Sequence, residues 1–174
     1  MEEESPPPFT ASRTDMIRKA ERGDINALRA VYDEARERMW EGGNTRQWKI
    51  GHPPLSVIES DISGGFLYVI VESNEIVGAF SIIGKEPTYD TIYDGSWPEG
   101  DYDYVTIHRV AGKRKASHVL RQAVVTASLL SPVIRIDTHV DNRKMQALIL
   151  KYGFTYCGKI TLLDGSMRIA FQKG

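Results

Sequence analysis

The sequence predicts an α/β (α+β) protein: one domain with helices on both faces of a mixed, mostly antiparallel sheet that contains a central parallel strand pair. Two predicted hairpins, one in the first half of the chain and one at its carboxyl end, require antiparallel neighbours. Between them a strand, a helix and another strand follow in order, which requires a parallel pair joined by a right-handed crossover. The 174 residues are too few for two comfortable hydrophobic cores.

In the first half of the chain, turn residues separate segments that differ in hydrophobic periodicity. Apolar residues recur at helical spacing after Asp24, a favourable N-cap, and Gly42 ends that helix. Two segments rich in β-branched and aromatic residues, joined by a short turn, predict the first hairpin. The predicted elements are a strand over residues 16–20, a helix from Asp24 to Gly42, a helix over residues 55–63, and strands over residues 66–72 and 76–83.

The second half begins with a long stretch, residues 84–102, in which turn residues alternate with aromatics. Such a stretch either shapes a binding site or packs as an ordered surface loop. Pro132 and Gly153 each end a predicted helix. The predicted elements are a strand over residues 104–110, a helix over residues 117–131, a strand over residues 133–140, a helix from Asp141 or Asn142 to Tyr152, and hairpin strands over residues 154–163 and 166–172.

Composition and charge exclude several classes of protein. A net charge of −1 gives no reason to expect nucleic acid or an anionic membrane as a partner. No apolar run reaches the roughly 18 residues needed to span a bilayer. The single cysteine, Cys157, excludes an intramolecular disulfide framework and a multi-cysteine zinc site. We therefore expect a cytoplasmic protein, with residues 1–14, acidic and rich in proline, as a flexible arm before a single domain over residues 15–174.

A basic loop between a predicted strand and a helix suits anion binding. Lys113, Arg114 and Lys115 stand directly before the helix, whose exposed amides and dipole attract phosphate. Three basic residues in a row also occur as an ordinary solvated turn. The position before an amphipathic helix favours the anion site.

The segments IHRVA, IRIDTHVDN and KYGF, in this order around the basic loop, resemble the GCN5-related N-acetyltransferases over residues 16–173. The resemblance implies acetyl-CoA as co-substrate and an amine as acceptor. It also implies that the main chain of the strand holds the pantetheine arm and that the following loop surrounds the pyrophosphate. The cofactor-binding residues that it implies are Arg109, Val110, Ala111, Gly112, Lys113, Arg114, Lys115, Ala116, Ser117 and Asn142.

The sequence departs from the family pattern at two places. The loop, AGKRKASHVL, lacks the central glycine that lets backbone amides approach phosphates. Ile149 stands where many members have a tyrosine that protonates the leaving thiolate. Tyr152 lies one helical turn further and is either a replacement acid or a residue that packs at the helix end.

His108 is the other candidate for proton transfer. It lies in the strand beside the implied acyl site, and histidine titrates near neutral pH. A buried histidine that only hydrogen-bonds the backbone is the alternative.

Asp137, His139 and Asp141 alternate along one strand and so could face the same way. This spacing could hold a metal ion, but no second cluster of ligands supports it, so we expect no metal. A role for His139 in orienting the substrate is favoured. Aromatic residues in the flanking loops either shape the acceptor pocket or cover the core; they are Trp40, Trp48, Tyr89, Tyr93 and Trp97.

These features predict an N-acetyltransferase in which an amine attacks the thioester directly, with backbone amides near Arg109 to Ala111 polarising the carbonyl. The alternative is a catalytically weakened CoA-binding or regulatory module of the same fold, which the two departures would favour. A metal-dependent hydrolase built on the three alternating residues is the weakest interpretation. The edge of the final hairpin offers a place where two chains could pair as a homodimer.

Overall fold

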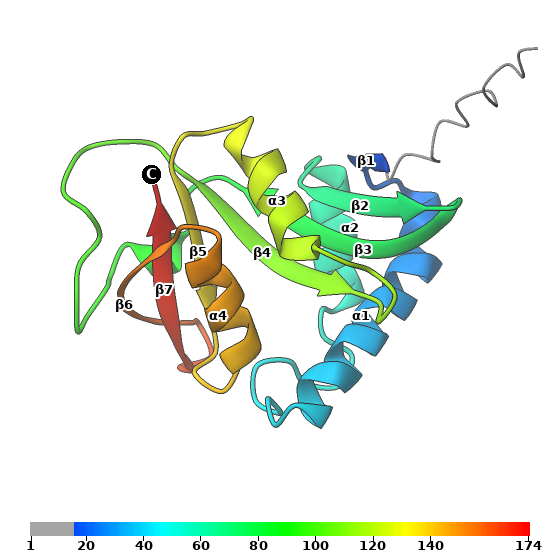
Figure 1. Cartoon of the computed structure of the whole chain (residues 1–174), viewed down its shortest axis with the longest axis horizontal. Helices are drawn as coiled ribbons and strands as arrows, with labels where there is room; N and C mark the ends of the chain where they lie inside the picture. The colour runs from blue at the N-terminus through cyan, green and yellow to red at the C-terminus, as the bar shows by residue number, and fades with distance from the viewer. Residues whose placement is uncertain (1–15) are drawn as a thin grey trace, which may run out of the picture.

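A computed structural model gives the fold of residues 16–174, which are the residues described below (Figure 1). The predicted flexible arm, residues 1–14, lies outside the described residues.

The described residues form one seven-stranded sheet, with the strands in the order β1-β2-β3-β4-β5-β7-β6. β4 and β5 are parallel, and every other neighbouring pair is antiparallel. The predicted fold class is therefore confirmed, including the central parallel pair. The strands are β1 (Met16–Lys19), β2 (Leu67–Glu72), β3 (Glu75–Ile83), β4 (Val105–Gly112), β5 (Ile134–Thr138), β6 (Thr155–Thr161) and β7 (Met167–Lys173).

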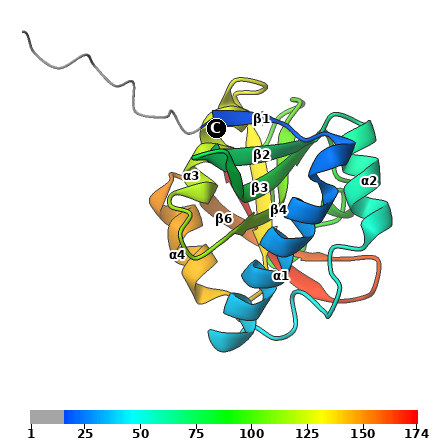
Figure 2. The same ribbon diagram turned by 90° about the vertical axis from the view of Figure 1, so that its right-hand side faces the viewer.

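Helices cover both faces of this sheet. Helices α1 (Ile25–Glu41) and α2 (Leu55–Ser63) lie on one face, and α3 (Val119–Ser128) and α4 (Arg143–Lys151) on the other (Figure 2). Each face buries its own hydrophobic cluster, one around Leu28 of α1 and one around Ile107 of β4. Within the described chain, no helix is long and apolar enough to cross a membrane.

The irregular stretch after β3 packs its own aromatic residues, as one of the two interpretations predicted. Tyr89 and Tyr104 are buried together with Ile160 of β6, and Trp97 packs against them. The guanidinium of Arg135 stacks on the ring of Trp97 at 3.9 Å. The stretch therefore closes the end of the sheet formed by β6 and β7.

The start of α3 differs from the predicted start at residue 117. His118, at the N-cap position, has φ 56°, in the left-handed region, so α3 begins at Val119. The helix also ends at Ser128, before the predicted end at residue 131.

A distortion in β4 separates it from β5. The parallel pairing reaches only as far as Ile107 and Ile136. Two residues later, Arg109 has φ 52°, and the register between β3 and β4 shifts at this point, as in a β-bulge. Bulges bend a strand, so β4 leaves β5 here, and from His108 to Gly112 the edge of β4 that faces β5 has no strand partner in the described chain.

Candidate functional site

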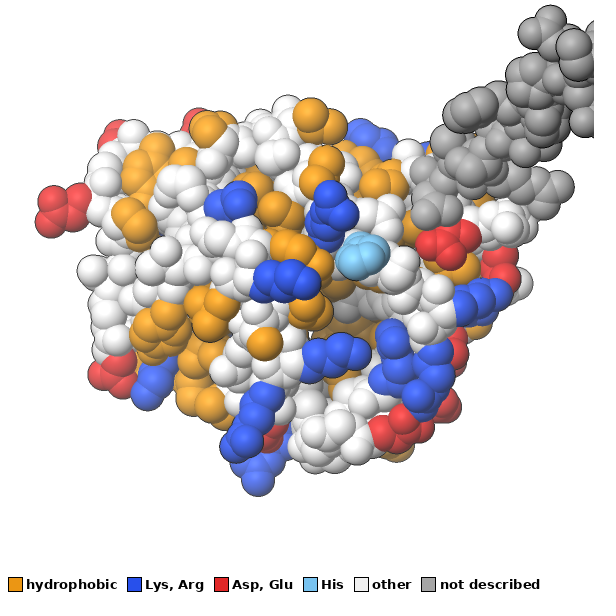
Figure 3. Space-filling view, viewed as in Figure 1, with side chains coloured by type: hydrophobic (Ala, Val, Ile, Leu, Met, Phe, Trp, Pro, Cys, Tyr) orange, Lys and Arg blue, Asp and Glu red, His pale blue; other side chains and the backbone are white. Residues whose placement is uncertain are grey.

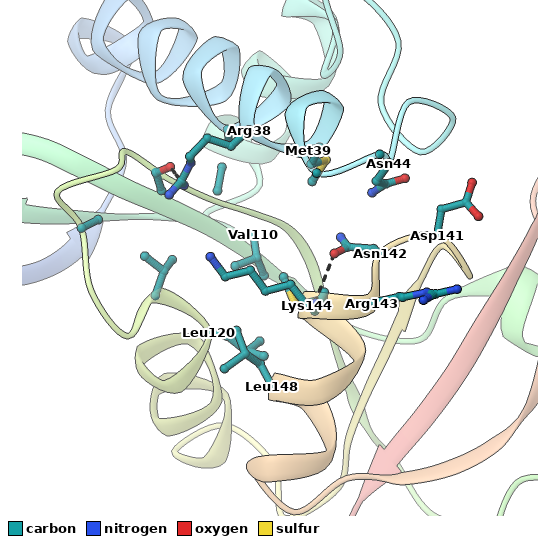
Figure 4. Close-up of a pocket in the computed structure, with 18 of the residues that line it drawn as sticks. Arg38, Met39, Asn44, Val110, Leu120, Asp141, Asn142, Arg143, Lys144 and Leu148 are labelled. Atoms are coloured by element: carbon teal, nitrogen blue, oxygen red, sulfur yellow. Dashed lines mark hydrogen bonds between the residues drawn. The ribbon is translucent and has the colours of Figure 1, made fainter.

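A groove of about 800 Å³ lies where β4 leaves β5. Its sides are α3, α4, and the end of α1 with the loop that follows (Figure 4). Val110, Ala111 and Gly112 of β4 line it, as does Ala116 of the basic loop. Of the residues implied to bind the cofactor, Asn142 at the start of α4 lines it as well.

The groove presents polar groups without partners. The first amides of α3 have no acceptor within the helix, because the first turn of any helix leaves its N–H groups unpaired. In the part of the chain that the structure describes, two buried side-chain atoms lack a hydrogen-bond partner: Nε of Arg38 and Oδ1 of Asn44. Both residues line the groove. An unpaired buried polar atom is costly. Both atoms lie beneath the surface of the groove, so the unpaired groups that a ligand can reach are the amides at the start of α3.

The three consecutive basic residues form ion pairs with acidic side chains, and their predicted role in binding the cofactor stays a prediction. Lys113 and Lys115 both bind Glu75 at the β2–β3 turn, and Arg114 binds Glu41 of α1. None of the three lines the groove.

Other basic residues line the groove instead, and Lys and Arg side chains surround the hollow seen in Figure 3. Lys144 extends over the groove from α4 (Figure 4). Sequence reasoning missed these residues, although a basic pair directly after Asn142 was a readable signal. The basic residues that line the groove are Arg38, Arg46, Arg143, Lys144 and Lys151.

Asn142 joins α4 to the loop after α1. Its Oδ1 accepts a hydrogen bond from Met145 N at 3.1 Å, which caps the helix. Its Nδ2 donates to Oε1 of Gln47 at 3.2 Å, and Nδ2 of Asn44 donates to the same oxygen at 3.0 Å. Oγ1 of Thr138 in β5 donates to that oxygen as well, at 3.4 Å, so Gln47 connects the loop to both α4 and β5.

Replacing Asn142 by alanine should lower the free energy of unfolding by about 1 kcal/mol, the usual effect of losing an N-cap. Asn142→Asp keeps the capping oxygen but loses the donor to Gln47, so its loss should be smaller. Urea denaturation of the ligand-free protein measures both values. Equal losses in the two variants would show that the cap does not account for the effect.

A second cavity, of about 470 Å³, adjoins the groove. Met39, Val110 and Asn142 line both, so the two spaces meet at the point where β4 and β5 separate. We call this second space the acceptor cavity. His108 and Arg109 of β4 line it, with Asp137 of β5.

His108 and Glu86 form a pair in the acceptor cavity, with Nε2 and Oε2 3.1 Å apart. The hydrogen bond from His108 holds the pKa of Glu86 at about 2, against the penalty of partial burial. Glu86 is therefore ionised near neutral pH and can only accept a hydrogen bond, so Nε2 of His108 carries the proton. When the ring is neutral, its free lone pair is on Nδ1, which makes Nδ1 available as a base.

Two further carboxylates support the walls of the cavity. The hydroxyl of Tyr89 donates to Asp137 at 2.6 Å, and burial raises the pKa of that tyrosine well above its usual range. Asp61 of α2 accepts two hydrogen bonds from Arg109, at 2.8 and 2.9 Å, and one from Ser81 at 2.8 Å. These bonds hold the side chain of Arg109 towards α2 while its backbone forms the bulge.

The aromatic residues predicted to shape the acceptor pocket lie mostly behind its lining. Trp48 lines the cavity, and its carbonyl accepts from Nε1 of Trp40. Tyr89 does not line the cavity, but its hydroxyl donates to Asp137, which does. Nε1 of Trp97 donates to the carbonyl of Tyr89. Tyr93 is exposed, and its backbone forms a single antiparallel β-bridge with the backbone of Lys159 in β6.

His139 is a buried residue whose Nδ1 accepts the N–H of Asp141 at 3.0 Å, and burial lowers its pKa. It lines neither space. No group of three or more His, Cys, Asp or Glu residues in the described chain is placed to hold a metal ion.

Ile149, at the place of the family's tyrosine, lies on α4, and Tyr152, the candidate acid, lies at its end. Ile149 is fully buried in the core. Tyr152 lines the groove beside Leu148 and Lys151, and its carbonyl accepts from Lys173.

The solved structures similar to this chain include acetyltransferases. A GNAT family acetyltransferase from Streptococcus agalactiae is 33% identical, with 91% of this chain and 94% of that chain covered and a TM-score of 0.79. One from Listeria monocytogenes is 20% identical, with 91% and 94% covered and a TM-score of 0.67. A ribosomal-protein-alanine N-acetyltransferase from Brucella melitensis is 20% identical, with 91% and 98% covered and a TM-score of 0.58. No family model and no curated protein matches the chain.

Proposed function

The chain belongs to the GNAT family of acetyltransferases, and from this premise we propose that it transfers the acetyl group of acetyl-CoA to an amine. The resemblance inferred from the sequence is thereby confirmed at the level of the family. One observation carries the finer proposal: the unpaired edge of β4 lies between a groove lined by the start of α3 and a second cavity with a paired histidine.

The groove suits CoA. Unpaired N–H groups at the start of α3 suit a pyrophosphate, and the basic residues around the groove add positive charge. The free edge of β4 offers N–H and C=O groups to the amides of a pantetheine arm, as a further strand would. A thioester at the end of that arm would lie at the junction of the two spaces, beside Val110.

In the reaction that we propose, the amine nitrogen attacks the thioester carbonyl, a C–N bond forms and the C–S bond breaks. Nδ1 of His108 accepts the proton that the nitrogen loses, while Glu86 holds the ring in the required tautomer. Amides of β4 near Val110 donate to the carbonyl oxygen as negative charge develops on it. The thiolate takes a proton from solvent or from Tyr152, whose role as an acid stays a prediction.

The second candidate is a module that binds CoA without efficient transfer. Two observations favour it: Ile149 belongs to the core, and the loop lacks the central glycine that is usual in the family. A thiol-release assay with acetyl-CoA and a panel of amines separates the two proposals. Release that depends on an added amine supports the transferase. Binding of acetyl-CoA without release from any amine supports the module and contradicts the transferase.

Replacing Gly112 by alanine should weaken acetyl-CoA binding about 10-fold. A Cβ at this position would lie 2.8 Å from Cγ2 of Val119, so Val119, the first residue of α3, must shift away from β4. Calorimetric titration measures the loss. Gly23→Ala is the matched control, because a Cβ at position 23 would meet nothing within 4 Å. The affinity of this variant for acetyl-CoA should be unchanged. Equal affinities for both variants would show that the spacing of α3 from β4 does not matter for binding.

A further inference from the structure

Arg168 of β7 is a cation inside the acceptor cavity. The residue is only 5% exposed, and it is among those that line the cavity. Arg168 is two residues before Ala170 in β7, and Ala170 pairs with Asp137 of β5. Side chains two residues apart along a strand share a face, so Arg168 is on the face of the sheet that bears Asp137.

The protein itself supplies no carboxylate to pair with this cation. The guanidinium donates to Oγ of Ser166 at 3.2 Å, to the carbonyl of Met167 at 3.0 Å and to the carbonyl of Gln47 at 3.4 Å. All three acceptors are neutral. Within residues 16–174, no carboxylate lies within 4.0 Å of it.

A buried guanidinium without a partner anion is energetically costly, so an anionic ligand beside it would be stabilised. Burial lowers the pKa of Arg168, and the charges of Asp137 and Asp164 oppose that shift from a distance. The neutral acceptors use two of its nitrogen atoms and fix the plane of the group. A fixed guanidinium matches the planar, two-oxygen geometry of a carboxylate.

Glu86 adds a negative charge on the β4 side of the cavity, where it pairs with His108. Asp137 and Asp164 also line the cavity and act on the charge of Arg168, but neither forms an ion pair with it. β4 and β7 are separated by β5, so two strand spacings, about 10 Å in total, separate the backbones that bear His108 and Arg168. The end of the cavity at Glu86 and His108 therefore suits an ammonium group, and the end at Arg168 suits an anion.

We propose that the acceptor is a small molecule that carries a carboxylate as well as the reacting amine, and that Arg168 binds this carboxylate. The inference rests on the proposed function, since it names the acceptor for the same site. A cavity of about 470 Å³ is in the range of small-molecule sites. Arg46 and Lys49, both exposed, add positive charge to the lining and favour an anionic ligand.

The direct test compares matched ligands on the unaltered protein. Free α-amino acids and longer ω-amino acids are each titrated beside their carboxamides into protein saturated with CoA, with binding followed by calorimetry. At least one amino acid should bind about 10-fold or more tightly than its carboxamide, because a charge-assisted hydrogen bond is lost in the amide. Equal or tighter binding of the carboxamide across the panel overturns the proposal.

Variants locate the effect. Arg168→Gln should abolish the preference for the carboxylate and leave carboxamide binding within about threefold, while Arg168→Lys should keep part of the preference because it keeps the charge. A preference that survives Arg168→Gln overturns the assignment to this residue. Lys49→Gln, an exposed residue that lines this cavity but not the groove, is the control for a general effect of charge and should change the preference less.

Failure of this inference can be told from failure of the proposed function. If acetyl-CoA binds and neutral amines release its thiol, but no carboxylate preference exists, the transferase stands and the inference falls. If the carboxylate preference is measured with CoA bound but no amine releases thiol, the binding role of Arg168 stands and the transferase falls.

Discussion

Replacing His108 by alanine should lower kcat/KM for the amine by about 100-fold or more, within the usual range for losing a general base. The ring belongs to the lining of the acceptor cavity and not to that of the groove. Acetyl-CoA affinity should therefore stay within about threefold of that of the unaltered protein. Steady-state rates with varied amine, combined with calorimetry for acetyl-CoA, measure the two effects separately.

Added imidazole distinguishes a base from a structural residue. If His108 accepts the proton, imidazole should restore part of the activity of the alanine variant, because it can enter the space that the side chain leaves. Glu86→Gln is a companion variant: it removes the carboxylate that fixes the tautomer, so it should lower kcat and respond little to imidazole. An unchanged rate in a folded His108→Ala protein would remove this residue from the mechanism.

Replacing Asp61 by alanine should lower the free energy of unfolding by about 3 kcal/mol, as for other ion pairs broken in a protein interior. The side chain of Asp61 is 10% exposed and that of Arg109 is 20% exposed, so the guanidinium would be left largely buried without its partner. The change should also weaken acetyl-CoA binding, since this pair holds the residue whose left-handed backbone forms the bulge in β4. Urea denaturation measures the stability, with an unchanged m-value as the check on two-state unfolding.

The double variant Asp61→Ala with Arg109→Ala is the control for this prediction. Removing both charges leaves no unpaired ion, so the double variant should be more stable than the sum of the two single losses implies. A loss below about 1 kcal/mol in the single Asp61 variant would show that the pair does not stabilise the bulge.

Most of the fold was predictable because its signals are local. The hairpin of β6 and β7 follows from the Asp164-Gly165 turn, and the parallel pair follows from the order of β4, α3 and β5. The start of α3 was misplaced by two residues because nothing in the local sequence marks His118 for a left-handed backbone.

The functional site was predictable only where a single segment builds it. Val110 to Gly112 and Asn142, which the resemblance implied to bind the cofactor, line the groove, and their binding of CoA stays a prediction. The pair of His108 with Glu86 joins residues 22 positions apart, and the bond from Arg168 to Gln47 spans 121 positions. Such contacts depend on how the strands are arranged, which periodicity does not report. For the same reason Lys113 and Lys115 looked free in the sequence, although Glu75 binds both.

The central claim is that the unpaired edge of β4 and the start of α3 bind CoA. Titration calorimetry of the full-length protein with acetyl-CoA tests it most directly. We expect saturable binding of one molecule per chain, competed by free CoA, with a Kd well below ~1 mM, the upper end of usual substrate constants. No heat at millimolar acetyl-CoA, from protein shown to be folded, would contradict the claim.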